Sequence, residues 1–198
     1  SHERFTRNKG SERIANTFQR WLLICIVIAY LITSAFTFIL QNGMVKIETQ
    51  AVFTAAINDV ELREVQLGEN FSLPVDALLQ RTDKNTKAMF ICSPNNPTAN
   101  AFEREDILRL ADEFDGMLVV DEAYIDFSSV ESVKSEVVSR RNIIVLQTLS
   151  KAWGMAGLRV GLALADERVV ELMSQVKYPY NINVATMAIV EELLTQGI

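Results

Sequence analysis

Three short apolar runs, none interrupted by a polar residue, constrain the fold of this 198-residue chain more than any other feature. They span residues 88–92 (AMFIC), 117–120 (MLVV) and 143–146 (IIVL). Runs of this length are typical of strands buried in a parallel sheet. A fourth segment, Leu62–Leu67, alternates apolar and polar residues as a half-buried strand does. The pattern predicts an α/β fold with a mostly parallel sheet.

Helical patterns separate these strands. After the first run, Asn100 is the expected N-cap and Glu103 takes the capping-box position. The apolar stripe of this helix comprises Ile107, Leu110, Ala111 and Phe114. Two further helices are expected over residues 166–175 and 183–195. Strands that alternate with helices strengthen the prediction of a layered α/β domain.

Residues 21–40 (WLLICIVIAYLITSAFTFIL) carry no charge. A helix of this length is about 30 Å long, which matches the apolar thickness of a bilayer. Basic residues precede it, and Trp21 lies at its edge, as is common at a membrane interface. We therefore expect one transmembrane helix, with residues 1–20 on the cytoplasmic side. The alternative is a fully buried helix of a soluble protein.

Charge divides the chain into two parts. Residues 1–46 hold six basic and two acidic residues, whereas residues 47–198 hold 13 basic and 23 acidic residues. We interpret 1–46 as a basic N-terminus with its apolar helix, and 47–198 as a separate domain. The acidic balance, with a pI near 4.9, argues against nucleic acid as a partner.

The rarity of histidine and cysteine excludes several kinds of site. The single histidine, His2, cannot supply a Ser-His-Asp triad or a cluster of histidine metal ligands. The two cysteines, Cys25 and Cys92, are too far apart in sequence for a CxxC motif. No metal site and no disulfide framework is expected.

Polar segments follow each of the three apolar runs. They are SPNNPT at 93–98, DEAY at 121–124 and TLSK at 148–151, the last followed by Gly154, Gly157 and Arg159. In open α/β sheets, ligands bind just beyond the carboxyl ends of the strands. Taken singly, each segment is more often a turn, a cap or a solvated loop. Their joint occurrence predicts a small-molecule site at one edge of the sheet.

Over residues 52–198, these motifs resemble the large domain of fold-type I pyridoxal-phosphate aminotransferases, and most of all the histidinol-phosphate aminotransferase group. The resemblance implies a partial three-layer large domain, pyridoxal 5'-phosphate as cofactor, and amino-group transfer from histidinol phosphate to 2-oxoglutarate in histidine biosynthesis. It also implies a cytoplasmic homodimer, whereas insertion of 21–40 implies a membrane-anchored chain.

The resemblance also assigns roles to single residues. Lys151 binds the cofactor aldehyde through its amine and then moves the substrate's α-proton. Asp121 pairs with the pyridine nitrogen, while Asn96 and Tyr124 form hydrogen bonds with the 3′-oxygen that the ring carries. The phosphate is held by Thr148, Ser150 and Arg159. Lys151, Asp121 and Tyr124 form the expected catalytic group.

The chain also departs from the family pattern. Ala99 follows Thr98 where the family has glycine. We expect the family's N-terminal phosphate loop and its small C-terminal domain to lack a counterpart here, and we therefore expect this chain to be weakly active or inactive. A threonine-phosphate decarboxylase or an aromatic aminotransferase is the alternative within the class. A single-pass membrane protein or a chimeric fragment without catalytic activity is the alternative outside it.

Overall fold

A computed structural model describes residue 55, residues 58–177 and residues 182–196. By their contacts these residues fall into two units, and the larger one comprises residues 63–172 with the described part of 179–198. The larger unit contains every strand of the sheet and every residue of the predicted site.

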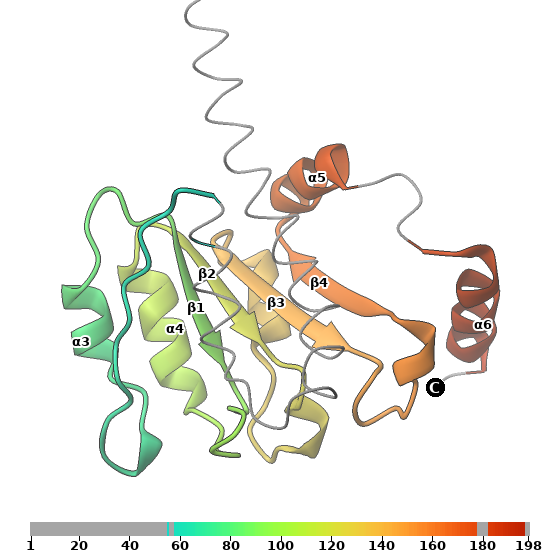
Figure 1. Cartoon of the computed structure of the whole chain (residues 1–198), viewed down its shortest axis with the longest axis horizontal. Helices are drawn as coiled ribbons and strands as arrows, with labels where there is room; N and C mark the ends of the chain where they lie inside the picture. The colour runs from blue at the N-terminus through green and yellow to red at the C-terminus, as the bar shows by residue number, and fades with distance from the viewer. Residues whose placement is uncertain (1–54, 56–57, 178–181, 197–198) are drawn as a thin grey trace, which may run out of the picture. The chain divides into compact units, whose positions relative to one another are not determined.

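The sheet has four strands in the order β1-β2-β3-β4 (Figure 1). They are β1 (Ala88–Cys92), β2 (Met117–Asp121), β3 (Ile143–Thr148) and β4 (Gly161–Ala165). The first three are parallel and β4 is antiparallel to β3, which confirms the prediction of a mostly parallel α/β sheet. The strand β4 was not predicted, because its sequence GLALA contains no β-branched or aromatic residue.

Four α-helices lie in the described part of the chain. They are α3 (Val75–Gln80), α4 (Arg104–Glu113), α5 (Glu167–Val176) and α6 (Val184–Thr195). The last three confirm the predicted helices, whereas the short α3 was not predicted. Short 3-10 segments lie at η1 (Glu69–Phe71), η2 (Ile125–Phe127), η3 (Val133–Val138) and η4 (Ala156–Leu158).

The predicted N-cap of α4 is wrong. The residue at the cap position is Glu103, and its side chain makes no capping hydrogen bond. The Asn100 amide instead donates to the carbonyl of Phe71 at 3.0 Å, so it joins the loop before α4 to η1 rather than capping a helix. Glu105 and Asp106 in the first turn provide the negative charge that favours a helix N-terminus.

The predicted strand over Leu62–Leu67 is also wrong, because these residues form no strand in the structure. Val65 and Leu67 are half-buried while Glu64 and Gln66 are exposed. The alternation of apolar and polar residues therefore reflects burial of one side of this segment. An extended segment can bury one side without forming the hydrogen bonds of a sheet.

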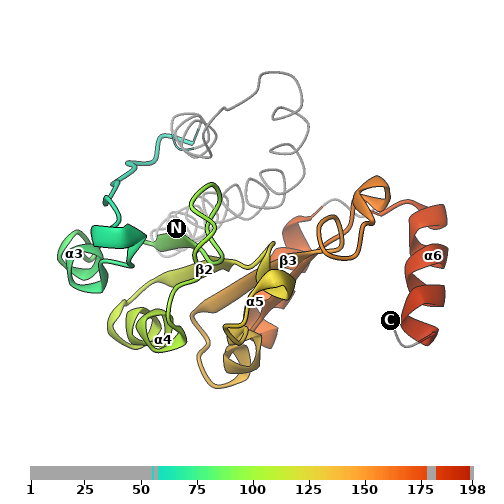
Figure 2. The same ribbon diagram turned by 90° about the horizontal axis from the view of Figure 1, so that it is seen from below.

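The main core lies between the sheet and α4, which covers one face (Figure 2). The helix contributes its predicted stripe, with Leu110 fully buried. The sheet contributes alternate residues of β1, β2 and β3, since successive strand residues face opposite sides. These sheet residues are Met89, Ile91, Leu118, Val120, Ile143 and Val145.

No helix in the described part of the chain is both long and apolar enough to cross a bilayer. The helix predicted over residues 21–40 lies outside the described residues.

Candidate functional site

The carboxyl ends of β1, β2 and β3 lie at one edge of the sheet because these strands are parallel (Figure 1). In the register of the sheet, Cys92 is opposite Asp121, and Asp121 is opposite Leu146. The three polar segments of the sequence therefore leave the sheet side by side.

The loop after β1 is tied to β2 and closed on itself. The Ser93 N–H donates to the Asp121 carbonyl at 2.9 Å, and the buried Ser93 hydroxyl accepts from the Phe102 N–H. Within the loop, the Asn95 carbonyl accepts the Ala99 N–H at 2.7 Å. The peptide bonds Ser93–Pro94 and Asn96–Pro97 are cis.

Ala99 has a φ of 60°, in the left-handed region that glycine adopts without steric cost. This geometry gives a physical reason for glycine at this position in the family pattern. In this chain, the closed hydrogen bonds of the loop hold an alanine in that conformation.

We expect Ala99→Gly to raise the free energy of unfolding by about 1 kcal/mol. A left-handed alanine costs about 1–2 kcal/mol, which exceeds the extra chain entropy that glycine gives the unfolded state. Urea denaturation measures the difference. The half-buried Ala101, whose φ is not positive, is the matched control: Ala101→Gly lowers stability. Equal losses in both variants would contradict the strain at Ala99.

Asp121 ends β2 as a half-buried carboxylate. Its Oδ1 accepts the Ala123 N–H at 3.0 Å. Burial raises the pKa of Asp121 above its ordinary value. The Ala123 hydrogen bond and the positive charge of Lys151 oppose this rise in pKa, while the negative charge of Glu122 adds to it.

Tyr124 lies between two other predicted site residues. The Asn96 amide approaches the Tyr124 hydroxyl at 3.4 Å, and the Lys151 Nζ lies 4.9 Å from the centroid of the tyrosine ring. The cation is therefore held against the face of an aromatic ring. Residues from all three strand ends thus contact one another directly.

The connection from β3 to β4 carries the remaining predicted residues. Thr148 is paired with Gly161, so residues 149–160 leave and re-enter the sheet at one place. The Ser150 N–H donates to the Thr148 hydroxyl at 3.1 Å. Near the two ends of this connection lie Lys151 and Arg159, eight positions apart in sequence.

Arg159 also has a left-handed backbone, with a φ of 57°. Its guanidinium donates to the Ala156 carbonyl of its own loop at 3.1 Å. From α6, the buried Thr186 hydroxyl donates to the Leu158 carbonyl at 3.3 Å. The N-terminus of α6 thus supports the residue that precedes Arg159.

Two residues of this region were not predicted as functional. Burial raises the pKa of the Cys92 thiol to about 12, and the negative charge of Asp121 adds to this rise, so the thiol is protonated at neutral pH. Glu122 is buried beside Asp121, and its carboxylate accepts several hydrogen bonds. The sequence signal that could have pointed to Glu122 is a second acidic residue directly after Asp121 at the end of the apolar run.

No cluster of three or more potential metal ligands occurs among the residues that the structure describes.

Comparison with known proteins gives consistent matches. The model of the aminotransferase class I and II family matches residues 53–197. The histidinol-phosphate aminotransferase of Parabacteroides distasonis is 47% identical over 140 residues, which is 71% of this chain and 41% of that protein. The chain thus spans less than half the length of this relative.

Solved structures show the same fold. The histidinol-phosphate aminotransferase of Sinorhizobium meliloti, in complex with pyridoxal-5'-phosphate, has a TM-score of 0.63 at 21% identity, over 71% of this chain and 39% of that one. The L-threonine-O-3-phosphate decarboxylase of Porphyromonas gingivalis has a TM-score of 0.62 at 22% identity, over 75% and 44%. Since the family model covers most of the chain, the chain belongs to the class I and II aminotransferase family.

Proposed function

We propose that this chain carries the pyridoxal-phosphate site of an aminotransferase that moves an amino group from histidinol phosphate to 2-oxoglutarate. The observation that carries the proposal is the meeting of Asp121, Tyr124 and Lys151 at the carboxyl ends of adjacent strands. The identity of 47% to a histidinol-phosphate aminotransferase supports the choice of amino donor.

The donor set fits the cofactor. Lys151 supplies a primary amine, and the half-buried Asp121 supplies an acceptor for a protonated ring nitrogen. Asn96 and Tyr124 supply an amide and a hydroxyl beside them. The Ser150 hydroxyl and the Arg159 guanidinium are donors that suit a phosphate group, whereas the Thr148 hydroxyl donates to the Val160 carbonyl at 3.2 Å in this structure.

When bound, the cofactor supplies an electron sink for the negative charge that develops at the substrate's α-carbon. The residues of the chain hold and move protons around it. With the cofactor bound, the Asp121 carboxylate would hold a proton on the ring nitrogen. The Lys151 amine would take up the substrate's α-proton and carry it as the general acid of the next step. Tyr124 positions that amine through the contact of its ring with Nζ.

Further parts of the proposal follow from the family. The amino donor and a 2-oxo acid are the expected small-molecule partners, and a second copy of the chain is the expected protein partner. We place the start of the family domain near residue 47, close to the start of the family match at residue 53. The third layer of the fold-type I large domain, the helix over 21–40 and the location of the chain remain predictions.

A single-turnover assay tests the proposed reaction. The chain is incubated with pyridoxal phosphate and histidinol phosphate, and pyridoxamine phosphate is measured by chromatography. We expect pyridoxamine phosphate to form, slowly and at no more than one equivalent per chain, and we expect Lys151→Ala to form none.

Parallel incubations separate the alternatives. Release of carbon dioxide from threonine phosphate, without pyridoxamine phosphate, would favour a decarboxylase. A higher yield with tyrosine than with histidinol phosphate would favour an aromatic aminotransferase. No reaction with any of these donors would contradict a catalytic role for this chain.

A further inference from the structure

Glu122 is a buried carboxylate that has no part in the proposed chemistry. It directly follows Asp121, and only 2% of its surface is exposed. Its N–H donates to the Leu146 carbonyl of β3 at 2.8 Å, so the backbone is still paired with the neighbouring strand at this point. Continued strand alternation places the side chains of Asp121 and Glu122 on opposite faces of the sheet.

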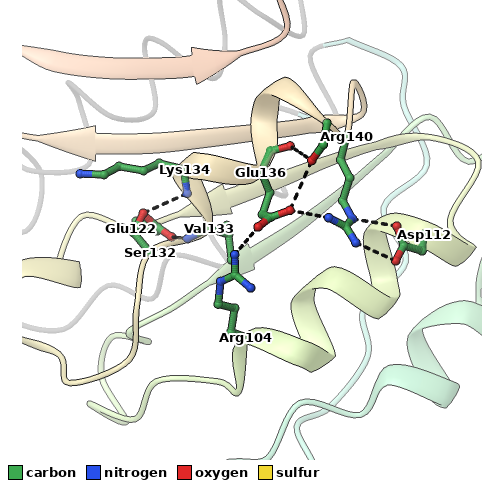
Figure 3. A network of polar contacts seen from close by, with 9 residues as sticks. Arg104, Asp112, Glu122, Ser132, Val133, Lys134, Glu136 and Arg140 are labelled. Carbon is green, nitrogen blue, oxygen red and sulfur yellow. Dashed lines mark hydrogen bonds and ion pairs between the residues drawn. The ribbon is translucent and has the colours of Figure 1, made fainter.

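Three donors satisfy the Glu122 carboxylate, two of which Figure 3 shows. Oε1 accepts the Val133 N–H at 2.9 Å, and Oε2 accepts the Ser132 hydroxyl at 2.5 Å. Oε2 also accepts the Gln147 amide at 2.9 Å. A buried carboxylate is costly unless donors surround it, and here the donors come from two other segments of the chain.

These hydrogen bonds join the two strand ends that carry the candidate site. Glu122 is the neighbour of Asp121 at the end of β2, and Gln147 is the neighbour of Thr148 at the end of β3. The Ser132 hydroxyl also lies 3.4 Å from the Gln147 amide. One carboxylate therefore fixes the spacing between Asp121 and the segment that leads to Lys151.

We propose that Glu122 is a positioning residue that holds the ends of β2 and β3 in the arrangement that binds the cofactor. This inference rests on the proposed function, because it concerns the placement of Asp121 and Lys151 toward pyridoxal phosphate. Glu122 acts from the opposite face of the sheet and touches neither the cofactor nor the substrate.

For Glu122→Gln, the lost hydrogen-bond geometry and the lost negative charge predict opposite changes in cofactor affinity. Burial raises the pKa of Asp121, and the negative charge of Glu122 contributes further to this rise. Loss of that charge alone favours ionised Asp121 and therefore tighter binding of a protonated cofactor ring. Weaker binding in Glu122→Gln therefore cannot come from the lost charge, and the variants below separate altered positions of the strand ends from general destabilisation.

The test measures cofactor affinity and backbone protection in the same variants. Affinity is the pyridoxal phosphate concentration that gives half-maximal borohydride-stable labelling of Lys151. Protection is amide hydrogen exchange of the cofactor-free chain, followed in peptides that cover 118–124 and 145–150. We expect Glu122→Gln to weaken affinity at least tenfold and to speed exchange in both peptides.

Two further variants complete the design. In Glu122→Gln/Gln147→Glu the carboxylate and the amide exchange places, so the hydrogen bond between the strand ends is restored and affinity recovers to within threefold. Glu136→Gln is the matched control. Glu136 is part-buried and accepts from Arg104 and Arg140 in a separate network (Figure 3), so its loss leaves affinity within twofold.

The outcomes separate this inference from the proposed function. If the unsubstituted chain is not labelled at Lys151, the proposed function fails. If it is labelled and Glu122→Gln binds equally well, only the role of Glu122 is overturned. Equal weakening in Glu136→Gln, or no recovery in the exchanged pair, also overturns that role, because the effect would then be general destabilisation.

Discussion

Asp121→Asn is expected to weaken pyridoxal phosphate binding about a hundredfold while it makes the cofactor-free chain more stable at neutral pH. Removal of one member of a buried, hydrogen-bonded charge pair costs about 2–5 kcal/mol, and each 1.4 kcal/mol is a factor of ten in affinity. Asparagine keeps an oxygen for the Ala123 N–H but cannot hold a proton on the ring nitrogen.

The gain in stability follows from the pKa of Asp121. Burial raises this pKa in the folded chain above its ordinary value in the unfolded chain. As the pH rises from the ordinary value through the raised one, the unfolded state loses its proton first, and the folded state becomes less stable relative to it. Asparagine does not titrate, so Asp121→Asn removes this pH-dependent decrease in stability.

Thermal unfolding at pH 3 and pH 7, with cofactor titration at pH 7, measures both effects. The exposed Asp126, in η2 shortly after Asp121, is the matched control, and we expect Asp126→Asn to change neither the stability nor the cofactor affinity. If Asp121→Asn lowered the stability of the cofactor-free chain at pH 7, the carboxylate would contribute to folding and not only to binding.

Leu118→Ala is expected to lower the free energy of unfolding by about 3–4 kcal/mol, which is a large part of the roughly 5–15 kcal/mol that stabilises a domain. Leu118 is fully buried in β2, between β1 and β3, and belongs to the core beneath α4. Its truncation leaves a cavity that the flanking strands cannot close.

Urea denaturation measures this loss, and Val138→Ala is the control. Val138 lies on η3 with 83% of its surface exposed, so its truncation changes stability by less than about 0.5 kcal/mol. Because β2 also carries Asp121, Leu118→Ala is expected to weaken cofactor binding as well. A loss below 1 kcal/mol would contradict a close-packed core at this position.

The sequence predicted the parts of the fold that rest on strong periodicity. The runs at 88–92, 117–120 and 143–146 are strands because continuous apolar character over this length suits burial inside a sheet. The apolar stripe of α4 placed Leu110 in the core for the same reason. Strand β4 was missed because glycine and alanine give a weak strand signal.

The candidate site was predictable in its composition but not in its contacts. Parallel strands place Asp121 and Lys151 at one edge of the sheet, and this follows from topology alone. The hydrogen bonds of Glu122 depend on how the turn at Ser132 folds back, which no local pattern encodes. The left-handed backbone at Arg159 depends likewise on the closure of the loop between β3 and β4.

The most direct test of the site is to find which lysine binds pyridoxal phosphate. The chain is incubated with one equivalent of cofactor and reduced with borohydride, and the pyridoxyl group is located by peptide mass spectrometry. The Lys151→Ala variant is treated in the same way, and so is a control, Lys134→Ala, which changes an exposed lysine of η3. We predict labelling at Lys151, its loss in Lys151→Ala and its retention in Lys134→Ala. A pyridoxyl label that is spread over several lysines would contradict a cofactor site at these strand ends. An amount of label that does not change in Lys151→Ala would contradict it too.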